Sequence, residues 1–539
     1  MVGKDYDEIT SFLGDYGVFQ WIIIVLLSLS TLSSGYAAMM AVFISDTPEH
    51  YCKVSVNSTR DGTDVEAPFR ERSSRIGPDS CSRYKLRGNW TESAGLSNDT
   101  EQCLYGWVFS TDRYSSTIVS EWGLVCENAW KVPLSTSCFF VGVLIGSFFS
   151  GPLSDRFGRK PVLFIAMAIQ TVSPLIQATS VSWVMFCILN CVRGLGQISS
   201  YIASLVLGSE MLTPTTRVSY AFLGHSTGFC VGYAILPLFA YFIRGWRVLL
   251  VATALPGFLF IPTWWLIPES PRWLLQKGRV EEAELVIRMA AKRNGILAPE
   301  VIFKADECLE LMQNKGEEEQ TYTYMDLIRT FNIRNITILS VFIWMSTAMV
   351  FYGLSLNTSN LNGNVYLNCF ISAAIDTVVC VATWLLVSHV PRPTLLSSTL
   401  MFCGITLLII KLVPKDMHVM IQVLAFGGKI GVSAAYCLAY VFFTELIPTV
   451  VRNMGLGFAS TAARIGTIIC PYVIYMGMYS MILPYIVFGI ISIMAAALSM
   501  LLPDTRNSKL PDLISQAQPI RRCCVQKEKA TDQSDSLGC

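Results

Sequence analysis

Five ionisable side chains lie inside long apolar stretches of this chain: Arg193, His225, Asp376, Lys429 and Arg464. A charge at the centre of a bilayer costs about 2.5–3.5 kcal/mol on insertion scales, so such residues are candidates for binding an ion or a substrate. We rank Arg464 first, because a fixed guanidinium pairs with a carboxylate through two parallel hydrogen bonds. The alternative is a structural ion pair with Asp376 or another acid. Lys429 is a second candidate anion contact, or else the partner of Asp376.

Polar and aromatic side chains accompany these charges. Arg193, Gln197 and Tyr201 are each four residues apart, which places them near one helix face and predicts that they line a cavity. Hydrogen bonding between helices is the alternative. Aromatic rings attract quaternary ammonium groups, although such rings also serve as plain packing. The aromatic candidates for a cation site are Trp344, Phe351, Tyr352 and Tyr440, with Tyr436 beside them.

The composition is that of a membrane protein. Hydrophobic residues make up 52% of the 539 residues, charged residues only 15%, and the mean hydropathy is +0.48. A soluble chain would carry about 25% charge. The net charge of +1 gives no reason to expect nucleic acid as a partner. We find no phosphate-binding loop, metal-ligand cluster or nucleophile triad in the sequence, so we expect no ATP-driven step, no enzyme activity and no cofactor.

Twelve stretches are long enough for membrane helices, which need about 20 apolar residues. They lie near 20–44, 132–153, 161–180, 182–208, 217–242, 246–267, 336–356, 365–388, 395–413, 418–443, 455–477 and 481–502. The predicted fold is an all-α membrane protein of twelve transmembrane helices in two six-helix pseudo-repeats. The predicted units are the first half (1–267, with an extracellular loop 46–130), a cytoplasmic helical loop (268–335), the second half (336–505) and a cytoplasmic tail (506–539).

A repeat supports the two halves. The segment 210–217 returns as 445–452, a shift of 235 residues, and Pro268-Glu-Ser returns as Pro503-Asp-Thr at the same shift. A duplicated hydrophobic unit is typical of secondary transporters, which bind substrate between the halves. The repeat is broken at Arg464, whose equivalent is Phe229, and this favours function over fold-building for Arg464.

Charges near the ends of the stretches predict a gate. We expect ion pairs that hold one conformation closed and break when the protein opens inward; the alternative is charge that only sets topology. The equivalent segment of the second half, 389–395, lacks the acid and the glycine of 151–160, so we expect an asymmetric gate. The predicted gating residues are Asp155, Arg156, Arg159, Glu210, Arg217, Glu445 and Arg452.

The loop 46–130 has the features of an extracellular segment. It contains the glycosylation sequons at Asn57, Asn89 and Asn98, and four cysteines. The cysteines Cys52, Cys81, Cys103 and Cys126 predict two disulfides, and three pairings are open. The distribution of Lys and Arg then places loop 268–335 and both termini in the cytoplasm of a multi-pass protein.

Several motifs resemble a known family. Gly151-Pro-Leu-Ser-Asp-Arg-Phe-Gly-Arg-Lys160 resembles the signature of the major facilitator superfamily. Pro268–Trp273, Ser120–Cys126 and Glu445–Asn453 resemble solute carrier family 22, and stretches such as Thr47–His50 resemble its organic cation/carnitine branch, over about residues 5–515. The resemblance implies the major facilitator fold, alternating access, a plasma-membrane location and sodium as the coupling ion, although no sodium site is evident in the sequence.

The resemblance also bears on the substrate. Cation transporters of the family carry Asp where this chain has Arg464, whereas the anion and carnitine branches carry Arg. We therefore expect a protein that lies in the lipid bilayer and transports small organic cations or zwitterions, similar to carnitine or ergothioneine, across it. The alternatives are an organic anion exchanger of the same family and a non-transporting receptor or scaffold on this fold. The exact substrate stays open, because this chain departs from the carnitine branch at Ser34, Arg193, Ser200, Asp376 and Phe442.

Overall fold

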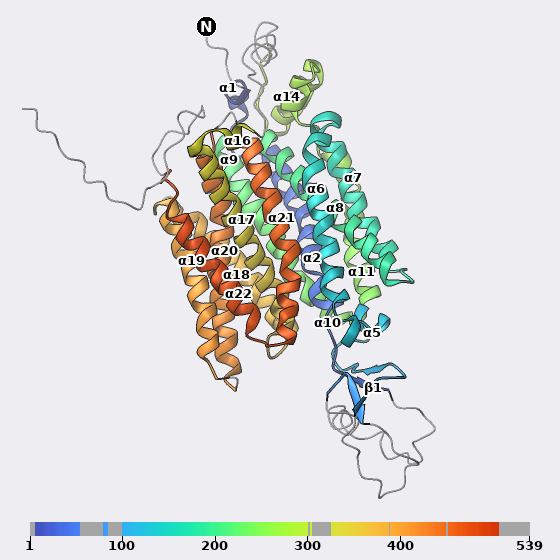
Figure 1. The fold of residues 1–539 in the computed structure, drawn as a ribbon. Coiled ribbons are helices and arrows are strands. Elements are labelled where there is room, and N and C mark those ends of the chain that lie inside the picture. Colours follow the sequence, from blue (N-terminus) through green and yellow to red (C-terminus); the bar gives the residue numbers. More distant parts are fainter. Residues whose placement is uncertain are drawn as a thin grey trace, which may run out of the picture.

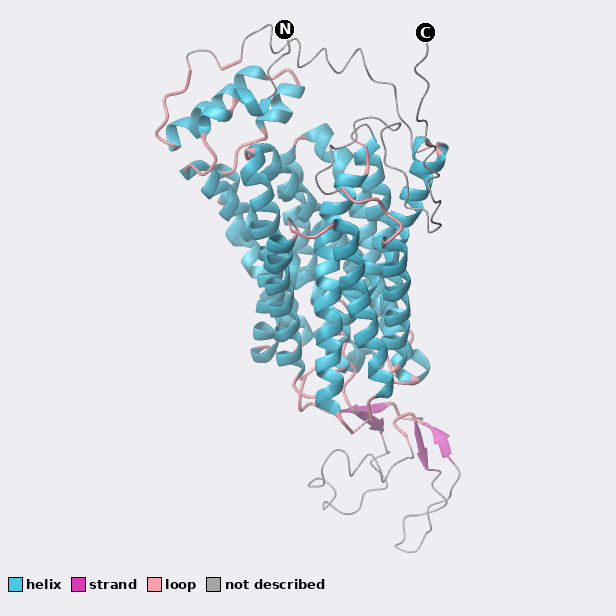
Figure 2. Cartoon of the chain, turned by 90° about the vertical axis from the view of Figure 1, so that its left-hand side faces the viewer, coloured by secondary structure: helices cyan, strands magenta, loops and turns pink. Residues whose placement is uncertain are grey.

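The computed structural model describes residues 6–53, 79–84, 100–299, 302–303, 325–387, 389–414, 416–448 and 451–505. The predicted glycosylation sites Asn57, Asn89 and Asn98 and the tail 506–539 lie outside these residues. The described chain is a bundle of long helices with short strands at one end, which we name the strand end (Figures 1 and 2). The other end carries the short helices α1, α14 and α16 and is named the opposite end.

The first half comes from residues before 268. Its helices are α2 (Val18–Met39), α3 (Ala41–Ile44), α6 (Lys131–Phe157), α7 (Arg159–Gln177), α8 (Trp183–Met211), α9 (Pro214–Ser219), the π-helix η5 (Tyr220–Ser226), α10 (Thr227–Phe242), α11 (Trp246–Ala254), η6 (Leu255–Phe260) and α12 (Thr263–Leu266). The second half contains α17 (Phe331–Leu356), η7 (Asn357–Asn360), α18 (Val365–Leu386), α19 (Arg392–Ile409), η8 (Ile410–Leu412), α20 (His418–Leu446), α21 (Arg452–Tyr475), η10 (Met476–Met478) and α22 (Leu483–Ser499).

Each predicted membrane stretch is helical over most of its length. Among the described residues, ten helices are long and apolar enough to cross a membrane. The two remaining stretches correspond to α8, a helix of 29 residues, and α22, which is shorter at 17 residues. The first-half helices lie on one side of the bundle and the second-half helices on the other, and they meet where α6 packs against α21 and α10 against α18 (Figure 1).

Close helix packing depends on glycine in α6. A Cβ atom on Gly142 would lie 1.8 Å from the backbone oxygen of Cys191, and one on Gly146 would lie 2.7 Å from that of Leu195. Both contacts are with the backbone of α8, which side-chain motion cannot relieve. The small residues therefore let α6 and α8 approach closely, as in other membrane bundles.

The described part of loop 46–130 contains four short strands, followed by the helix α5 (Ile118–Trp122) and the 3-10 helix η4 (Cys126–Asn128). β1 (His50–Cys52) pairs with β4 (Trp107–Phe109), and β2 (Ser82–Tyr84) pairs with β3 (Thr100–Gln102), both antiparallel. The pairings bring the cysteines together as Cys52–Cys103 and Cys81–Cys126. The N-terminus of α5 is closed by a capping box of Thr117 and Ser120.

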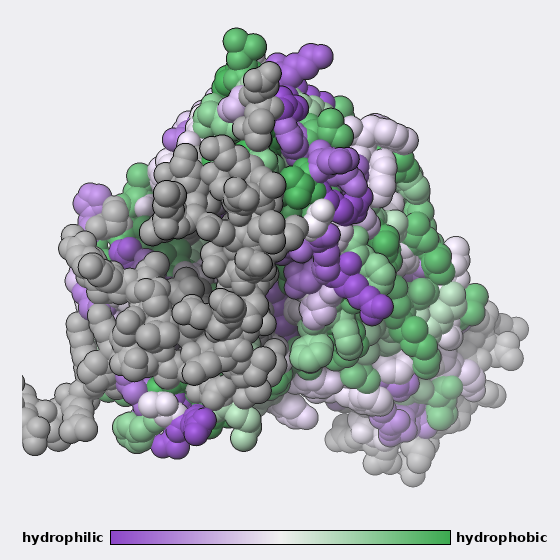
Figure 3. Space-filling model, turned by 90° about the horizontal axis from the view of Figure 1, so that it is seen from above, coloured by the Kyte–Doolittle hydropathy of each residue, from purple (hydrophilic) through white to green (hydrophobic). Residues whose placement is uncertain are grey.

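At the opposite end, short helices cover the first half. These are α1 (Tyr6–Ile9), η1 (Ser11–Leu13), α13 (Pro271–Gln276) and α14 (Val280–Arg293), with α16 (Asp326–Arg329) before the second half. Trp273 and Ile287 pack with Tyr6 and Phe12, so the N-terminal segment rests on the helices that follow residue 268. Hydrophilic side chains gather on this end, while hydrophobic side chains cover much of the flank (Figure 3).

The two halves contact each other near the strand end. The Ser137 hydroxyl donates to the Ile468 carbonyl over 2.8 Å, from α6 to α21. The Tyr366 hydroxyl donates to the Arg113 carbonyl over 3.2 Å, and its ring stacks on Phe43 at 5.6 Å between centroids. These contacts join the halves at the strand end.

Candidate functional site

Arg464 lies midway along α21 and is 5% exposed. Its Nε has no hydrogen-bond partner, and no carboxylate among the described residues lies within ion-pair distance of it. The alternative pair with Asp376 is wrong, because Asp376 binds Lys429 instead. Arg464 is therefore a buried cation with no acidic partner in the part of the chain that the structure describes.

Phenol groups surround Arg464 from both halves. Tyr201 of α8, Tyr352 of α17, and Tyr436 and Tyr440 of α20 all lie near its guanidinium. The Tyr352 side chain lies next to the guanidinium. Tyr440 keeps 42% of its surface exposed, and Tyr201 and Tyr436 are half-buried. The ring of phenol groups around Arg464 is therefore partly accessible from outside. The arrangement places a cation at the interface between the halves.

The predicted aromatic candidates form one cluster beside Arg464. The rings of Phe351 and Tyr436 stack at 4.6 Å between centroids, and Trp344 meets Tyr440 edge-on at 4.4 Å. Tyr352 contacts Phe351 at 5.4 Å. We name Trp344, Phe351, Tyr352, Tyr436 and Tyr440 the aromatic cluster. Its ring faces can attract an organic cation while Arg464 attracts an anion.

Lys429 and Asp376 satisfy each other. Lys429 Nζ lies 3.0 Å from Asp376 Oδ1, and the two side chains are 2% and 4% exposed. Lys429 also donates to the Ser355 hydroxyl over 2.6 Å, and the Ser433 hydroxyl donates to Asp376 over 2.5 Å. Of the two roles that the sequence left open for Lys429, the structure therefore favours partner of Asp376 over free anion contact. The Lys429 Nζ lies 3.6 Å from the Phe351 ring centroid, so the Lys429–Asp376 pair packs against the aromatic cluster.

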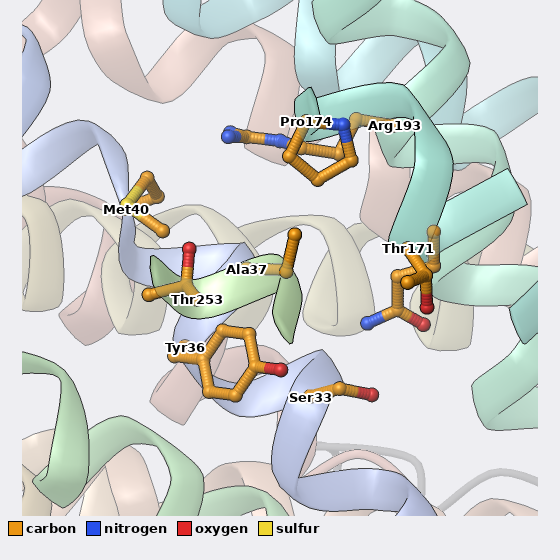
Figure 4. Close-up of a pocket in the computed structure, with 10 residues that line it drawn as sticks. Ser33, Tyr36, Ala37, Met40, Thr171, Pro174, Arg193 and Thr253 are labelled. Carbon is orange, nitrogen blue, oxygen red and sulfur yellow. The ribbon is translucent and has the colours of Figure 1, made fainter. Parts of the chain in front are cut away.

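The predicted polar stripe of α8 does not line a single cavity. Tyr201 faces Arg464 and packs against His225 at 4.1 Å, whereas Arg193 lines a cavity inside the first half with residues of α2, α7 and α11 (Figure 4). Gln197 lies between them and is buried. The reason is helical geometry: four residues advance a helix by about 40° beyond a full turn, so Arg193 and Tyr201 point about 80° apart.

The charges of the first-half gate form a cluster at the opposite end. Arg159 binds Glu210 through Nη2 at 3.0 Å and through Nε at 3.1 Å. Asp155 joins from the other side at 2.7 Å. Arg156 was predicted as a partner, but it is exposed and lies over the Phe157 ring instead. Arg156 lies in the last turn of α6, one residue after Asp155, and forms no ion pair among the described residues; its gating role stays a prediction.

The second half has a matching pair. Arg392 Nη2 lies 3.2 Å from Glu445 Oε1, and the Thr505 hydroxyl donates to Glu445 over 2.6 Å. Arg392 belongs to the segment that lacks the acid and glycine, so the predicted asymmetry concerns Asp155 and not the Arg–Glu pair itself. The side chain of Arg452 lies outside the described residues.

The remaining gating residue, Arg217, binds within the first half. It donates to the Ser209 carbonyl over 2.7 Å and lies 3.4 Å from Asp7. Arg272 also binds Asp7. Among the described residues, no ion pair at the opposite end joins the first half to the second, in contrast to the contacts that bridge the halves at the strand end.

Several residues of these sites were missed from the sequence. Arg392 lies two residues before the position that the 235-residue shift assigns to Arg159, so aligning arginines alone would have found it. Glu269 accepts from the backbone N–H of Arg159 at 3.0 Å and stabilises the start of α7, a role for the repeated Pro-Glu-Ser motif. Asp7 carried no signal, because its partners Arg217 and Arg272 are more than 200 residues away.

Comparisons with known proteins agree with this architecture. Residues 34–513 match the family model "Sugar (and other) transporter". The chain is 47% identical to the organic cation/carnitine transporter 2 of Homo sapiens, over 95% of this chain and 94% of that protein. It is 44% identical to solute carrier family 22 member 4 of Mus musculus, over 99% and 98% of the two chains. The inward-open xylose transporter XylE from E. coli shares the fold, with a TM-score of 0.63 and 15% identity over 93% of this chain and 100% of that chain.

Proposed function

The chain belongs to the sugar (and other) transporter family as a member of solute carrier family 22, and we propose that it carries small organic zwitterions across the plasma membrane. Membership makes it a multi-pass membrane transporter rather than an enzyme. The observation that carries the proposal is Arg464, a buried guanidinium without an acidic partner among the described residues, set beside the aromatic cluster.

The two groups of the site suit the two charges of a zwitterion. A substrate carboxylate supplies the anion that Arg464 lacks, through charge-assisted hydrogen bonds. Ring faces of Tyr436 and Phe351 attract a quaternary or delocalised cation, worth about 0.5–2 kcal/mol for each good contact. Lys429 is neutralised by Asp376. The local balance is therefore one net positive charge from Arg464, which fits a zwitterion better than an anion of higher charge.

The site also suits alternating access. Tyr201 comes from the first half, and Arg464 and the aromatic cluster come from the second, so a bound substrate would contact both halves. We assign the strand end to the outside of the cell, because disulfides persist in an oxidising environment, and we assign both termini to the cytoplasm. The strand-end contacts would then close the outer path, and the pairs Arg159–Glu210 and Arg392–Glu445 would rearrange as the halves rock.

Carnitine and ergothioneine are the leading substrates of the proposal. Two of the positions at which this chain differs from the carnitine branch lie in the packed interior of one half rather than beside Arg464. Ser200 donates to Gln170 inside the first half, and Phe442 is fully buried in the core of the second half. Relatives of this chain are named as organic cation/carnitine transporters, which supports the same substrate class.

Uptake in transfected cells tests the proposal. Labelled carnitine, ergothioneine and an aromatic carboxylate are compared with choline, each with sodium and with sodium replaced by N-methylglucamine, against surface level. We expect uptake of a zwitterion, and we propose sodium as the coupling ion on the family resemblance. Uptake of the aromatic carboxylate alone, driven by an internal anion, would assign the exchanger instead. No uptake of any probe at a normal surface level would favour a receptor.

A further inference from the structure

Two thiols lie side by side between α6 and α8, in the part of the first half nearest the strand end. Cys138 belongs to α6 and Cys187 to α8, and neither belongs to a disulfide. The two side chains are next to each other. Cys138 is partly exposed, whereas Cys187 is buried. The transport site does not include this pair, which lies within one half.

The glycine contacts of α6 set the register of the two helices. The glycines and the α8 residues that they face are spaced by four residues in both helices: Gly142 with Cys191, and Gly146 with Leu195. One step of four residues nearer the strand end, the same register places Cys138 opposite Cys187. An ideal Cβ on Gly142 would lie 3.0 Å from the Cα of Cys191, so the two backbones are very close one turn away from the thiols.

Hydrogen bonds on the other side of the pair agree with this register. The Trp183 ring N–H donates to the Ser135 hydroxyl over 2.7 Å, and the Asn190 side chain donates to the Ser135 carbonyl over 2.8 Å. The Cys187 thiol lies 3.7 Å from the same hydroxyl. Ser135 and Cys138 are three residues apart, so they share a face of α6. Contacts from α6 therefore hold Cys187 between Ser135 and Cys138.

We propose that Cys138 and Cys187 are a redox-sensitive pair, which hydrogen peroxide converts into a disulfide between α6 and α8. Disulfides join residues whose Cα atoms are about 4.4–6.8 Å apart, and helices that pack this closely suit such a spacing. A reactive cysteine of this kind is accessible and has a second thiol beside it that resolves the first oxidation product. Cys138 has the accessible position, and Cys187 has the resolving one.

The reaction has two steps. The sulfur of Cys138 attacks one peroxide oxygen, the O–O bond breaks, and Cys138 becomes a sulfenic acid while one water molecule leaves. The sulfur of Cys187 then attacks the sulfenic sulfur, the S–O bond breaks, and a second water molecule leaves. The two sulfur atoms lose two electrons, which peroxide takes up, and the two thiol protons end in the two water molecules.

The disulfide would fix the strand-end part of α6 to α8. Ser137, the neighbour of Cys138, makes one of the contacts that join the halves, with the Ile468 carbonyl of α21. The first half would then carry this contact on a more rigid helix pair. The cross-link also closes a loop that contains all of α7, which lowers the entropy of the unfolded chain.

Peptide mapping tests the pair directly. The purified full-length protein in detergent is treated with hydrogen peroxide, the remaining thiols are blocked with N-ethylmaleimide, and chymotryptic peptides are analysed by mass spectrometry without reduction. We expect two peptides joined through Cys138 and Cys187, lighter than the separate thiol peptides by two hydrogen atoms. Recovery of both residues without a link, or a link from Cys138 to Cys191, would overturn the proposal.

Cys187→Ser provides the second measurement, because serine has nearly the size of cysteine and can keep the contact with Ser135. Peroxide should raise the Tm of wild type by about 2–4 °C and should not raise that of Cys187→Ser. Cys470→Ser, at a fully buried cysteine of α21, is the matched control and should keep both the link and the rise. An equal rise in Cys187→Ser and wild type would assign the stabilisation to other thiols, such as the neighbours Cys380 and Cys437, and would overturn the role of the α6–α8 link.

Discussion

The pair Lys429–Asp376 should stabilise the second half, and replacing one partner should show it. Lys429→Met keeps much of the volume of the side chain but leaves the Asp376 carboxylate buried, with the Ser433 hydroxyl as its hydrogen-bond donor. Removing one partner of a buried ion pair costs about 3–5 kcal/mol. The 2–4% exposure of the two side chains places this pair in that class.

The magnitude converts to a measurable shift. With an unfolding entropy of about 2.1 cal/mol/K per residue, a chain of 539 residues that unfolds as one unit loses about 3–4 °C of Tm for this change. A larger shift is expected if the second half unfolds by itself. The double variant Lys429→Met/Asp376→Leu removes both charges, so it should melt above either single variant.

The assay is a thermal shift of purified protein at one heating rate, with Lys411→Met as the matched control. Lys411 is exposed in η8, which follows α19, and no shift in Tm is expected for its substitution. The reasoning is refuted if Lys429→Met melts with wild type. It is also refuted if the Tm loss of the double variant equals the sum of the two single losses, because the charges would then act independently.

Three further changes follow from the structure. Glu445→Gln removes the partner of Arg392, whose hydrogen bonds to a charged group are worth about 1.5–3 kcal/mol, so uptake should fall about tenfold or more at normal surface level; unchanged uptake would remove Glu445 from the gate. Gly142→Ala forces α6 from the Cys191 backbone and should abolish surface expression, whereas Gly151→Ala, with open space around it, should leave expression normal; equal expression of the two would contradict the packing account. Burial raises the pKa of Asp46 at the strand end to about 6, above its unfolded value of 3.8, so its contribution favours folding at low pH and is lost as pH rises through about 6. Asp46→Asn should therefore raise Tm at pH 7.5 but not at pH 4.5. The gain in the free energy of unfolding is at most about 3 kcal/mol before partial exposure is discounted, and an equal gain at both pH values would show that the carboxyl does not titrate in this range.

The architecture was readable from the sequence because two periodic signals were strong. Apolar runs gave the helices, and the 235-residue shift gave the halves. α8 illustrates the limit of such signals: it is a full-length helix that is not among the ten helices found long and apolar enough to cross a membrane, and it carries Arg193. Its polar residues indicated a functional helix, but the sequence did not predict which neighbouring helices each side chain contacts.

The candidate site was readable in part. Arg464 and the aromatic residues could be named because charge and rings in a membrane segment are rare, and the structure brings them together. The separation of Arg193 from Tyr201 depends on an angle around the helix and on the position of α2, α7 and α11, which no local pattern records. The disulfide pairing likewise depends on how β1 pairs with β4.

The account rests most directly on Arg464 as the partner of a substrate carboxylate. The decisive measurement is uptake, expressed as kcat/KM, of carnitine by wild type and by Arg464→Gln at matched surface level, with choline as the probe that lacks a carboxylate. Loss of a buried charged partner costs about 2–5 kcal/mol, which is about 30-fold or more in kcat/KM. The account predicts that wild type strongly prefers carnitine and that Arg464→Gln loses this preference through a fall in carnitine uptake. Carnitine uptake that stays at the wild-type level in Arg464→Gln would contradict it.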